Sequence, residues 1–199
     1  ASNTVSAFPV LDNTSTDKTV SPGGTVVRGE TLTYHISLYN SGTVTASVAP
    51  QPKGQPLTVV TPHAEARIQG TEFLLAVEPQ SSRLEVLDGS VQFVNRADGK
   101  AVVVNGGTFA TAAKGGGIVA RSLLAEPWQS QDIGEVGLRG VARLDGNSRC
   151  TAKGAGRNNC TTRDQFHFVY RTLDGDGEIR ARVMNLELTH KEARAGVVL

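Results

Sequence analysis

Apolar and polar residues alternate along several short stretches of the chain. Between residues 32 and 38, leucine, tyrosine, isoleucine and leucine occupy every second position, with polar or partly polar side chains between them. The same period of two recurs within residues 59–94, where turns containing glycine or proline separate the stretches. This alternation predicts half-buried β-strands joined by tight turns. No stretch keeps the spacing of an amphipathic helix, so the sequence predicts an all-β protein with little helix.

The composition and the charge restrict the classes of partner. Glycine accounts for 22 of the 199 residues and apolar residues for 39%, a composition typical of chains rich in turns and strands. Lysine and arginine number 20, aspartate and glutamate 19, and the two signs are interspersed. We therefore expect no nucleic-acid partner, because such proteins carry a concentrated basic surface. No apolar run is long enough for a membrane helix, so we expect no membrane span.

Two cysteines and two sequons indicate the compartment. Cys150 and Cys160 enclose a glycine-rich polar loop, and we expect a disulfide that closes it. Two free thiols or half of a metal site are the alternatives, although no CxxC pair is present. Asn13 and Asn159 begin Asn-x-Ser/Thr sequons and are candidate glycosylation sites. Because disulfides persist in oxidising compartments, these features predict an extracellular or cell-surface protein.

The first fifty residues contain a motif of surface proteins. Residues 16–48 resemble the opening half of the immunoglobulin-like repeats of bacterial and archaeal surface proteins, and the matching residues are Gly29, Leu32, Thr33, Tyr34, Ile36, Leu38, Asn40 and Gly42. The resemblance implies sandwich-like strands, but it stops before a second set of strands. We expect residues 1–50 to form such a half unit, with residues 1–20 as a donor arm. The proline-rich residues 49–56 predict a boundary.

A second motif lies in residues 57–112, within an expected domain of residues 51–114. It resembles the FecR-type extracytoplasmic domain, and the matching residues are Thr61, Pro62, Gly70, Thr71, Phe73, Val86, Leu87, Gly89 and Val91. We expect structural roles for them, since glycine lets a strand turn sharply and Phe73 belongs to an alternating apolar row. The resemblance also implies a function, because FecR-type regulators sense a transporter and control a sigma factor.

The C-terminal part resembles a third β family. Residues 130–199 are similar to the first half of the concanavalin- or laminin-G-like jelly rolls of secreted bacterial proteins, and the matching residues are Asp132, Ile133, Gly134, Asp164, Phe166, Phe168, Tyr170, Gly175, Asp176, Ile179, Ala181, Arg182, Val183, Ala195, Gly196 and Val197. We expect a linker at residues 115–131 and a partial jelly roll with the cysteine loop at residues 132–199. The chain is thus predicted to be a prokaryotic mosaic of small β modules.

The sequence predicts no catalytic residue, no metal site and no cofactor. The four histidines, none of them at metal-ligand spacing, are His35, His63, His167 and His190. A solvated strand face is the expected setting of His35 and His167. No Gly-x-Ser-x-Gly motif supplies a nucleophile. The acidic residues within 174–178 could offer oxygens to calcium, but their Asp-Gly-Asp-Gly sequence first predicts a turn. The glycines of residues 114–117 indicate a flexible linker more than a phosphate cradle.

The two half modules suggest how the chain is used. A half sandwich exposes an unpaired strand edge and an apolar face, which proteins normally cover. Our first hypothesis is therefore a secreted, non-catalytic structural protein that assembles with itself, head to tail, into a filament or cell-surface layer by strand sharing. A carbohydrate-binding or adhesive module, with glycans as partners, is the alternative. FecR-like envelope signalling is the second alternative.

Overall fold

The computed structural model describes residues 16–21, 33–38, 42–51, 56–146, 149–156, 164–187 and 189–197. These residues form fifteen strands and no helix, which confirms the all-β prediction. The strands are β1 (Thr16–Ser21), β2 (Thr33–Leu38), β3 (Gly42–Val48), β4 (Leu57–Val60), β5 (Ala64–Ile68), β6 (Thr71–Val77), β7 (Ser81–Asp88), β8 (Ser90–Asn95), β9 (Ala101–Asn105), β10 (Thr108–Ala113), β11 (Ala120–Ser122), β12 (Gln129–Ile133), β13 (Val141–Asp145), β14 (Arg149–Lys153) and β15 (Phe166–Tyr170).

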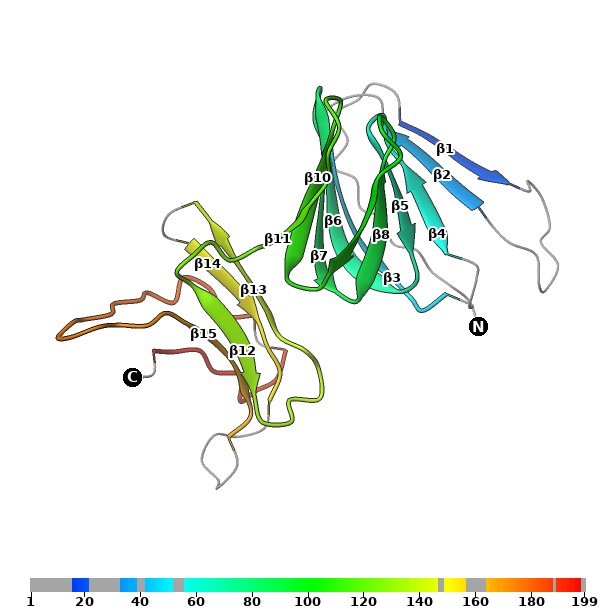
Figure 1. The fold of residues 1–199 in the computed structure, drawn as a ribbon. Helices are drawn as coiled ribbons and strands as arrows, with labels where there is room; N and C mark the ends of the chain where they lie inside the picture. The colour runs from blue at the N-terminus through cyan, green and yellow to red at the C-terminus, as the bar shows by residue number, and fades with distance from the viewer. Residues whose placement is uncertain are drawn as a thin grey trace.

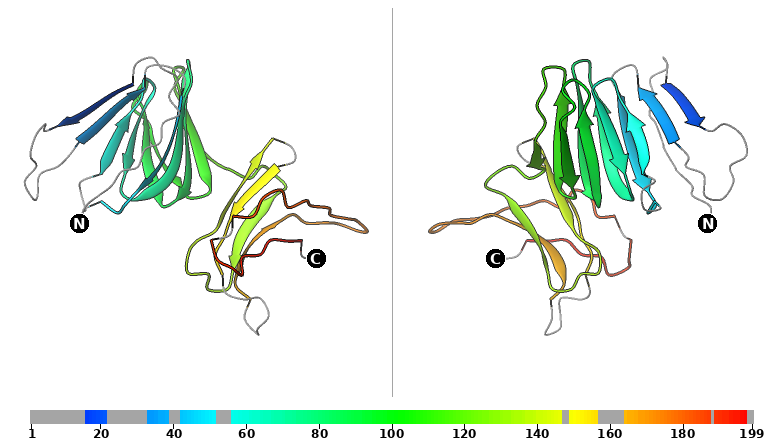
Figure 2. Two further views of the ribbon diagram at one scale, coloured as in Figure 1. Left: turned by 180° about the vertical axis from the view of Figure 1, so that it is seen from behind. Right: turned by 45° about the vertical axis from the view of Figure 1, so that its right-hand side comes forward.

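A two-layer β-sandwich is the largest unit (Figure 1). One layer has five strands in the order β11-β10-β7-β6-β3, and the other has four in the order β4-β5-β8-β9. All their pairings are antiparallel. The ribbon β1-β2 continues from the β4 side of the four-stranded layer (Figures 1 and 2).

Strict alternation of buried and accessible residues produces a single core between the two layers. On β6, Phe73, Leu75 and Val77 point inward and are at most 3% exposed, while the residues between them are only half buried. Phe93 on β8 is fully buried and belongs to the same cluster from the opposite layer. Because successive side chains of a strand point to opposite faces, the alternating sequence fixes which face of each sheet lies in the core.

Strand β3 lies in this sandwich, although the sequence analysis assigned it to an immunoglobulin-like unit ending at residue 50. It pairs with β6 from Gly42 opposite Val77 to Val48 opposite Thr71. Val44 and Val48 on β3 are buried in the shared core. The proline-rich residues 49–56 therefore follow a strand of one layer and precede a strand of the other, and they do not separate two cores.

The C-terminal module is smaller and lies beyond β11 (Figure 2). It contains two antiparallel ribbons, β12-β15 and β13-β14. Residues 171–187 follow β15 without forming a strand. Among the described residues none forms a helix that is long and apolar enough to cross a membrane.

Candidate functional site

The Thr-Pro pair of the FecR-like motif forms the turn between β4 and β5. The N–H of Thr61 donates to the carbonyl oxygen of Ala64 at 2.8 Å, and the Thr61 hydroxyl accepts from the N–H of Ala64 at 2.9 Å. The same hydroxyl lies 2.9 Å from the hydroxyl of Ser82 on β7, in the opposite layer. Thr61 is 2% exposed and Ser82 fully buried. The turn is thus tied to the other sheet by a buried hydrogen bond.

His63 and Arg96 complete the polar surroundings of this turn. Nδ1 of His63 is 3.2 Å from the Ser82 hydroxyl, and Nη1 of Arg96 donates to the Thr61 carbonyl at 3.0 Å. A serine beside a histidine is the beginning of a nucleophilic site. Here the serine has no exposed surface, so a substrate cannot reach its hydroxyl. We therefore assign the hydrogen-bonded group Thr61, Ser82 and His63 a structural role.

Two glycines of the motif lie together at the other end of the sandwich. Gly70 has φ of 133°, and a Cβ atom there would lie 2.8 Å from Cα of Pro50. Gly89 has φ of 82°, and a Cβ atom there would lie 2.6 Å from the carbonyl oxygen of Gly70. The hydroxyl of Thr71 donates to the Ser90 carbonyl at 3.1 Å and closes the group. Neither glycine position has room for a side chain.

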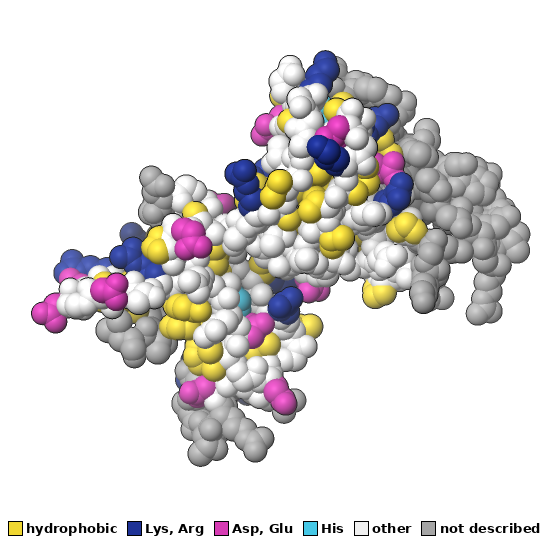
Figure 3. Space-filling model, in the orientation of Figure 1, with side chains coloured by type: hydrophobic (Ala, Val, Ile, Leu, Met, Phe, Trp, Pro, Cys, Tyr) yellow, Lys and Arg dark blue, Asp and Glu magenta, His cyan; other side chains and the backbone are white. Residues whose placement is uncertain are grey.

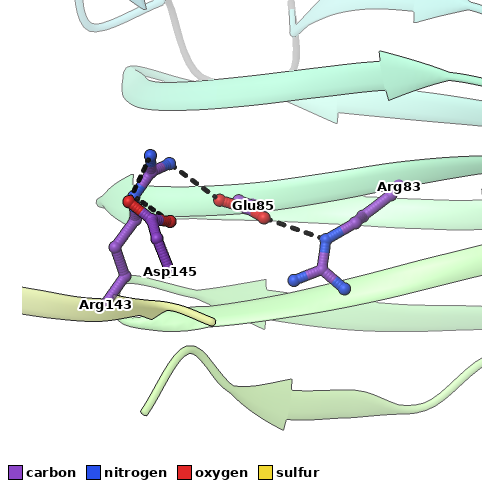
Figure 4. A network of polar contacts seen from close by, with 4 residues as sticks. All are labelled: Arg83, Glu85, Arg143 and Asp145. Carbon is purple, nitrogen blue, oxygen red and sulfur yellow. Dashed lines mark hydrogen bonds and ion pairs between the residues drawn. The ribbon is translucent and has the colours of Figure 1, made fainter. Parts of the chain in front are cut away.

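Ion pairs connect the sandwich with the C-terminal module. Glu85 on β7 is 12% exposed and accepts from Nε of Arg83 at 2.9 Å. Its other oxygen lies 3.4 Å from Nη1 of Arg143 on β13, which also pairs with Asp145 at 3.3 Å (Figure 4). We call Arg83, Glu85, Arg143 and Asp145 the junction network. Sequence reasoning missed it, because the pairing of Glu85 with Arg143 spans 58 positions.

Two further contacts strengthen this junction. Lys153 on β14 pairs with Glu72 on β6. The N–H of Leu144 donates to the carbonyl of Leu123 at 3.4 Å, so β13 also reaches the segment after β11. Leu123 itself is only 7% exposed. These charged and polar contacts tie the C-terminal module to the outer face of the five-stranded layer, and Val141 and Ala142 of β13 are themselves buried.

The cation–π contact between Arg83 and Phe109 lies on the same outer face. The Arg83 guanidinium carbon is 3.5 Å from the ring centroid of Phe109 on β10. In the register of the sheet Phe109 is opposite Glu85, so the arginine lies against both neighbours. A guanidinium that stacks on a ring and binds a carboxylate has little freedom to rotate, which fixes the position of Glu85 for Arg143.

A histidine–carboxylate pair lies inside the C-terminal module. Nδ1 of His167 on β15 is 2.8 Å from Oδ1 of Asp132 on β12, and the N–H of Gly140 donates to both oxygens of Asp132 at 3.1 Å. The His167 side chain is only 4% exposed, so its expected place on a solvated face was wrong. Its Nε2 atom is buried and has no hydrogen-bond partner among the described residues. A Cβ atom at Gly140 would lie 2.1 Å from the ring, so only glycine fits there.

Asp98 holds the glycine-rich residues 114–117 against the turn between β8 and β9. Its carboxylate accepts from the N–H of Gly117 at 2.9 Å and from the N–H of Lys100 at 3.1 Å. These two backbone hydrogen bonds, first that of Gly117, lower the pKa of Asp98 below its ordinary value. The structure thus fixes residues 114–117 at Gly117, whereas the sequence indicated a flexible linker.

The cysteine and glycosylation predictions fall largely outside the described residues. Cys160, Asn13 and Asn159 all lie there. Cys150 is on β14 and forms no disulfide with another described residue. Desolvation and then the charge of Asp145 raise the pKa of this thiol, which disfavours its reactive thiolate form. The disulfide and the glycans remain predictions.

The described residues also offer no metal centre. They contain no group of three or more histidine, cysteine, aspartate or glutamate side chains close enough to hold a metal ion. The acidic residues within 174–178 flank a bend at Gly175, which has φ of 77°. Acidic and basic side chains are interspersed over the face seen in Figure 3.

Two solved structures resemble part of the chain, and both are described as a proposed anti-sigma factor from Parabacteroides distasonis. One is 14% identical, with a TM-score of 0.37, over 45% of this chain and 42% of that chain. The other is 12% identical, with a TM-score of 0.40, over 60% of each chain. This chain therefore spans about half the length of these two proteins. A comparison with curated proteins gives no match.

A comparison with protein families gives a match that covers most of the strands of the sandwich. Residues 19–92 match the family described as FecR protein. The match begins in β1, well before the predicted start at residue 57, and includes strands that we had interpreted as half of an immunoglobulin-like unit. This finding contradicts the hypothesis of a self-assembling filament subunit, because that hypothesis required those strands to lack partners, whereas β3 completes the FecR-type sandwich. The jelly-roll resemblance of residues 130–199 remains a prediction. Residues 19–92 of this chain are therefore a FecR-type region.

Proposed function

We propose that this chain is an extracytoplasmic part of an envelope signalling protein. The observation that carries the proposal is the FecR match over residues 19–92, from β1 to β8. FecR-type regulators sense a transporter and control a sigma factor, so the sandwich would receive its signal through contact with another envelope protein. The same match supports an extracytoplasmic location, since FecR domains are extracytoplasmic parts of envelope proteins.

The described residues support a role in binding more than in catalysis. The buried Ser82 cannot meet a substrate, and the His167–Asp132 pair belongs to no group of three or more potential metal ligands among the described residues. The polar junction of Glu85 with Arg143 offers a means of transmission instead, because a partner that displaces the C-terminal module would change what the outer sheet face presents. We therefore propose a non-enzymatic signalling function.

Transcript profiling in the source organism tests this proposal. Cells with an in-frame deletion of residues 57–113 are compared with cells in which Asp98 alone is changed to asparagine, which leaves the sandwich core in place. We expect the deletion to alter one small group of transcripts that share a promoter sequence, because a sigma factor acts on a defined set of promoters. Unaltered transcripts in the deletion strain would contradict signalling.

A further inference from the structure

Exposed apolar side chains are concentrated in one segment of the C-terminal module. The described residues include nine large hydrophobic side chains that are clearly exposed, and five of them lie between residues 173 and 186: Leu173, Ile179, Val183, Met184 and Leu186. This segment leaves the module after β15, turns at Gly175 and returns, and it points away from the sandwich in every view (Figures 1 and 2). Scattered exposed hydrophobic residues are common, but a concentration of them indicates an interaction surface.

The backbone of the same segment has no partner strand in the part of the chain that the structure describes. Among the described residues, no backbone–backbone hydrogen bond involves residues 171–186. The sequence of residues 178–183 nevertheless alternates as a strand does, with Ile179, Ala181 and Val183 each following a charged residue. Unpaired backbone groups beside alternating apolar side chains form a template to which another strand can pair.

These unpaired backbone groups favour one kind of binding partner over another. A lipid surface would cover the apolar side chains but would leave the N–H and C=O groups unsatisfied, which is costly in an apolar medium. A β-strand would satisfy the backbone and cover the side chains together. An added strand is therefore the occupant that matches both features of the segment.

The charged residues between the apolar ones indicate which side chains the partner strand carries. Arg180 and Arg182 occupy the alternate positions, and Nε of Arg180 pairs with Glu178 at 2.6 Å while both side chains remain largely exposed. Side chains directly opposite one another on paired strands interact, and opposite charges are favourable there. Valine or isoleucine opposite Ile179 and Val183, with glutamate or aspartate opposite the arginines, gives the complementary pattern.

We propose that residues 178–187 bind an extended segment of a partner protein by β-strand addition, and that this segment alternates apolar and acidic residues. The surface is separate from the FecR-type sandwich, so the inference does not depend on the proposed signalling function. It assigns the C-terminal module a second contact, at the end of the protein that points away from the sandwich.

Titration with a synthetic peptide tests the inference. The probe is a fluorescently labelled ten-residue peptide of alternating valine and glutamate, added to the 199-residue chain while anisotropy is recorded. We expect saturable binding, slower amide hydrogen exchange at residues 179–186, and about tenfold weaker binding by the Val183→Asp variant, since it removes an apolar contact and repels the peptide. The matched control is Val103→Asp on β9, because Val103 is 55% exposed and Val183 is 53% exposed; this variant should bind like the wild type.

Two altered peptides separate strand addition from nonspecific adhesion. A peptide N-methylated at alternate residues keeps its side chains but loses the backbone donors that would face residues 178–187, and it should not bind. A peptide with lysine in place of glutamate should bind much more weakly, because its charges repel Arg180 and Arg182. Equal binding of the N-methylated peptide, no binding of any peptide at about 1 mM, or no change in amide exchange would overturn the inference.

The other occupants also give distinct results. Formation of a dimer by the chain alone in sedimentation equilibrium, abolished by Val183→Asp, would mean that a second copy occupies the segment. Binding to anionic lipid vesicles with no binding of the peptide would mean that a membrane surface does. Each of these results would replace the partner strand and overturn the inference.

Discussion

Glu85 and Arg143 meet at 3.4 Å across the junction of the two modules, although 58 positions separate them in the sequence. Glu85 is positioned by Arg83 on its own strand, so its second oxygen is free to receive Arg143 (Figure 4). The contact therefore joins an element that is fixed within the sandwich to one that belongs to the C-terminal module. Salt and substitution can weaken the charged contacts of this attachment separately from the sandwich core.

Substitution of Glu85 by glutamine should loosen the C-terminal module and leave the sandwich folded. The ion pairs with Arg83 and Arg143 are lost, at a cost of about 1 kcal/mol, since both arginines retain contact with water. Amide exchange should become faster in β13 and β14 while β6 remains protected, and the wild type should approach the same behaviour at high salt. Glu65→Gln is the control, because Glu65 and its ion-pair partner Arg67 are both on β5 and do not join the two modules. An equally protected β13 in both variants would show that the junction does not depend on Glu85.

Replacement of Thr61 by valine should destabilise the sandwich. The change keeps the shape of the side chain but leaves the buried Ala64 N–H without its partner and the Ser82 hydroxyl with His63 alone. The expected loss in the free energy of unfolding is about 1–3 kcal/mol, measured by urea denaturation. Thr58→Val on the preceding strand β4 is the matched control, since Thr58 points to the half-exposed outer face. Similar midpoints for both variants would argue against a structural role of the Thr-Pro turn.

Substitution of Gly89 and of Gly99 by alanine separates the cost of steric crowding from the cost of a positive φ. Both have positive φ, 82° and 70°, so alanine costs about 1 kcal/mol or more at either position. A Cβ atom at Gly99 meets open space, whereas one at Gly89 would lie 2.6 Å from the Gly70 carbonyl oxygen. Thermal unfolding should therefore show a clearly larger loss for Gly89→Ala than for Gly99→Ala. Equal losses would mean that the close approach of the two motif glycines adds nothing to the conformational cost.

The local parts of the fold could be predicted from the sequence, and the long-range parts could not. Alternation identified the strands and placed Phe73 in a core, because the period of two is a property of each strand by itself. The Thr-Pro and Gly-Thr pattern identified the FecR-type region, which the family match confirms although its limits differ. The partnership of β3 with β6 was not foreseen, because the proline-rich residues between them resemble a domain boundary.

The side-chain contacts of the candidate site could not be predicted for the same reason. Thr61 was singled out from its motif, but its partner Ser82 lies 21 positions away on a strand of the opposite layer. His167 alternates with aromatic residues as a solvent-facing residue would. However, Gly140 just before β13 and Gly154 just after β14 lie close against its side chain. Burial of this kind depends on which elements meet, and the alternation within one strand does not contain that information.

Acid should release the glycine-rich segment from the sandwich. The pKa of Asp98 is lowered in the folded protein by hydrogen bonds from Gly117 and then Lys100, so its stabilising effect is complete above the ordinary pKa of an aspartate and is lost as the pH falls through the lower, folded-state value. The exchange rate of the Gly117 amide, followed by NMR over the pH range in which carboxylates titrate, should rise toward low pH beyond the intrinsic change. Asp98→Asn should exchange rapidly throughout and lose this pH dependence, whereas Asp88→Asn on β7 should behave like the wild type. A Gly117 amide that stays protected in Asp98→Asn would show that the segment is held by its bonds at Lys114 and Gly116 alone.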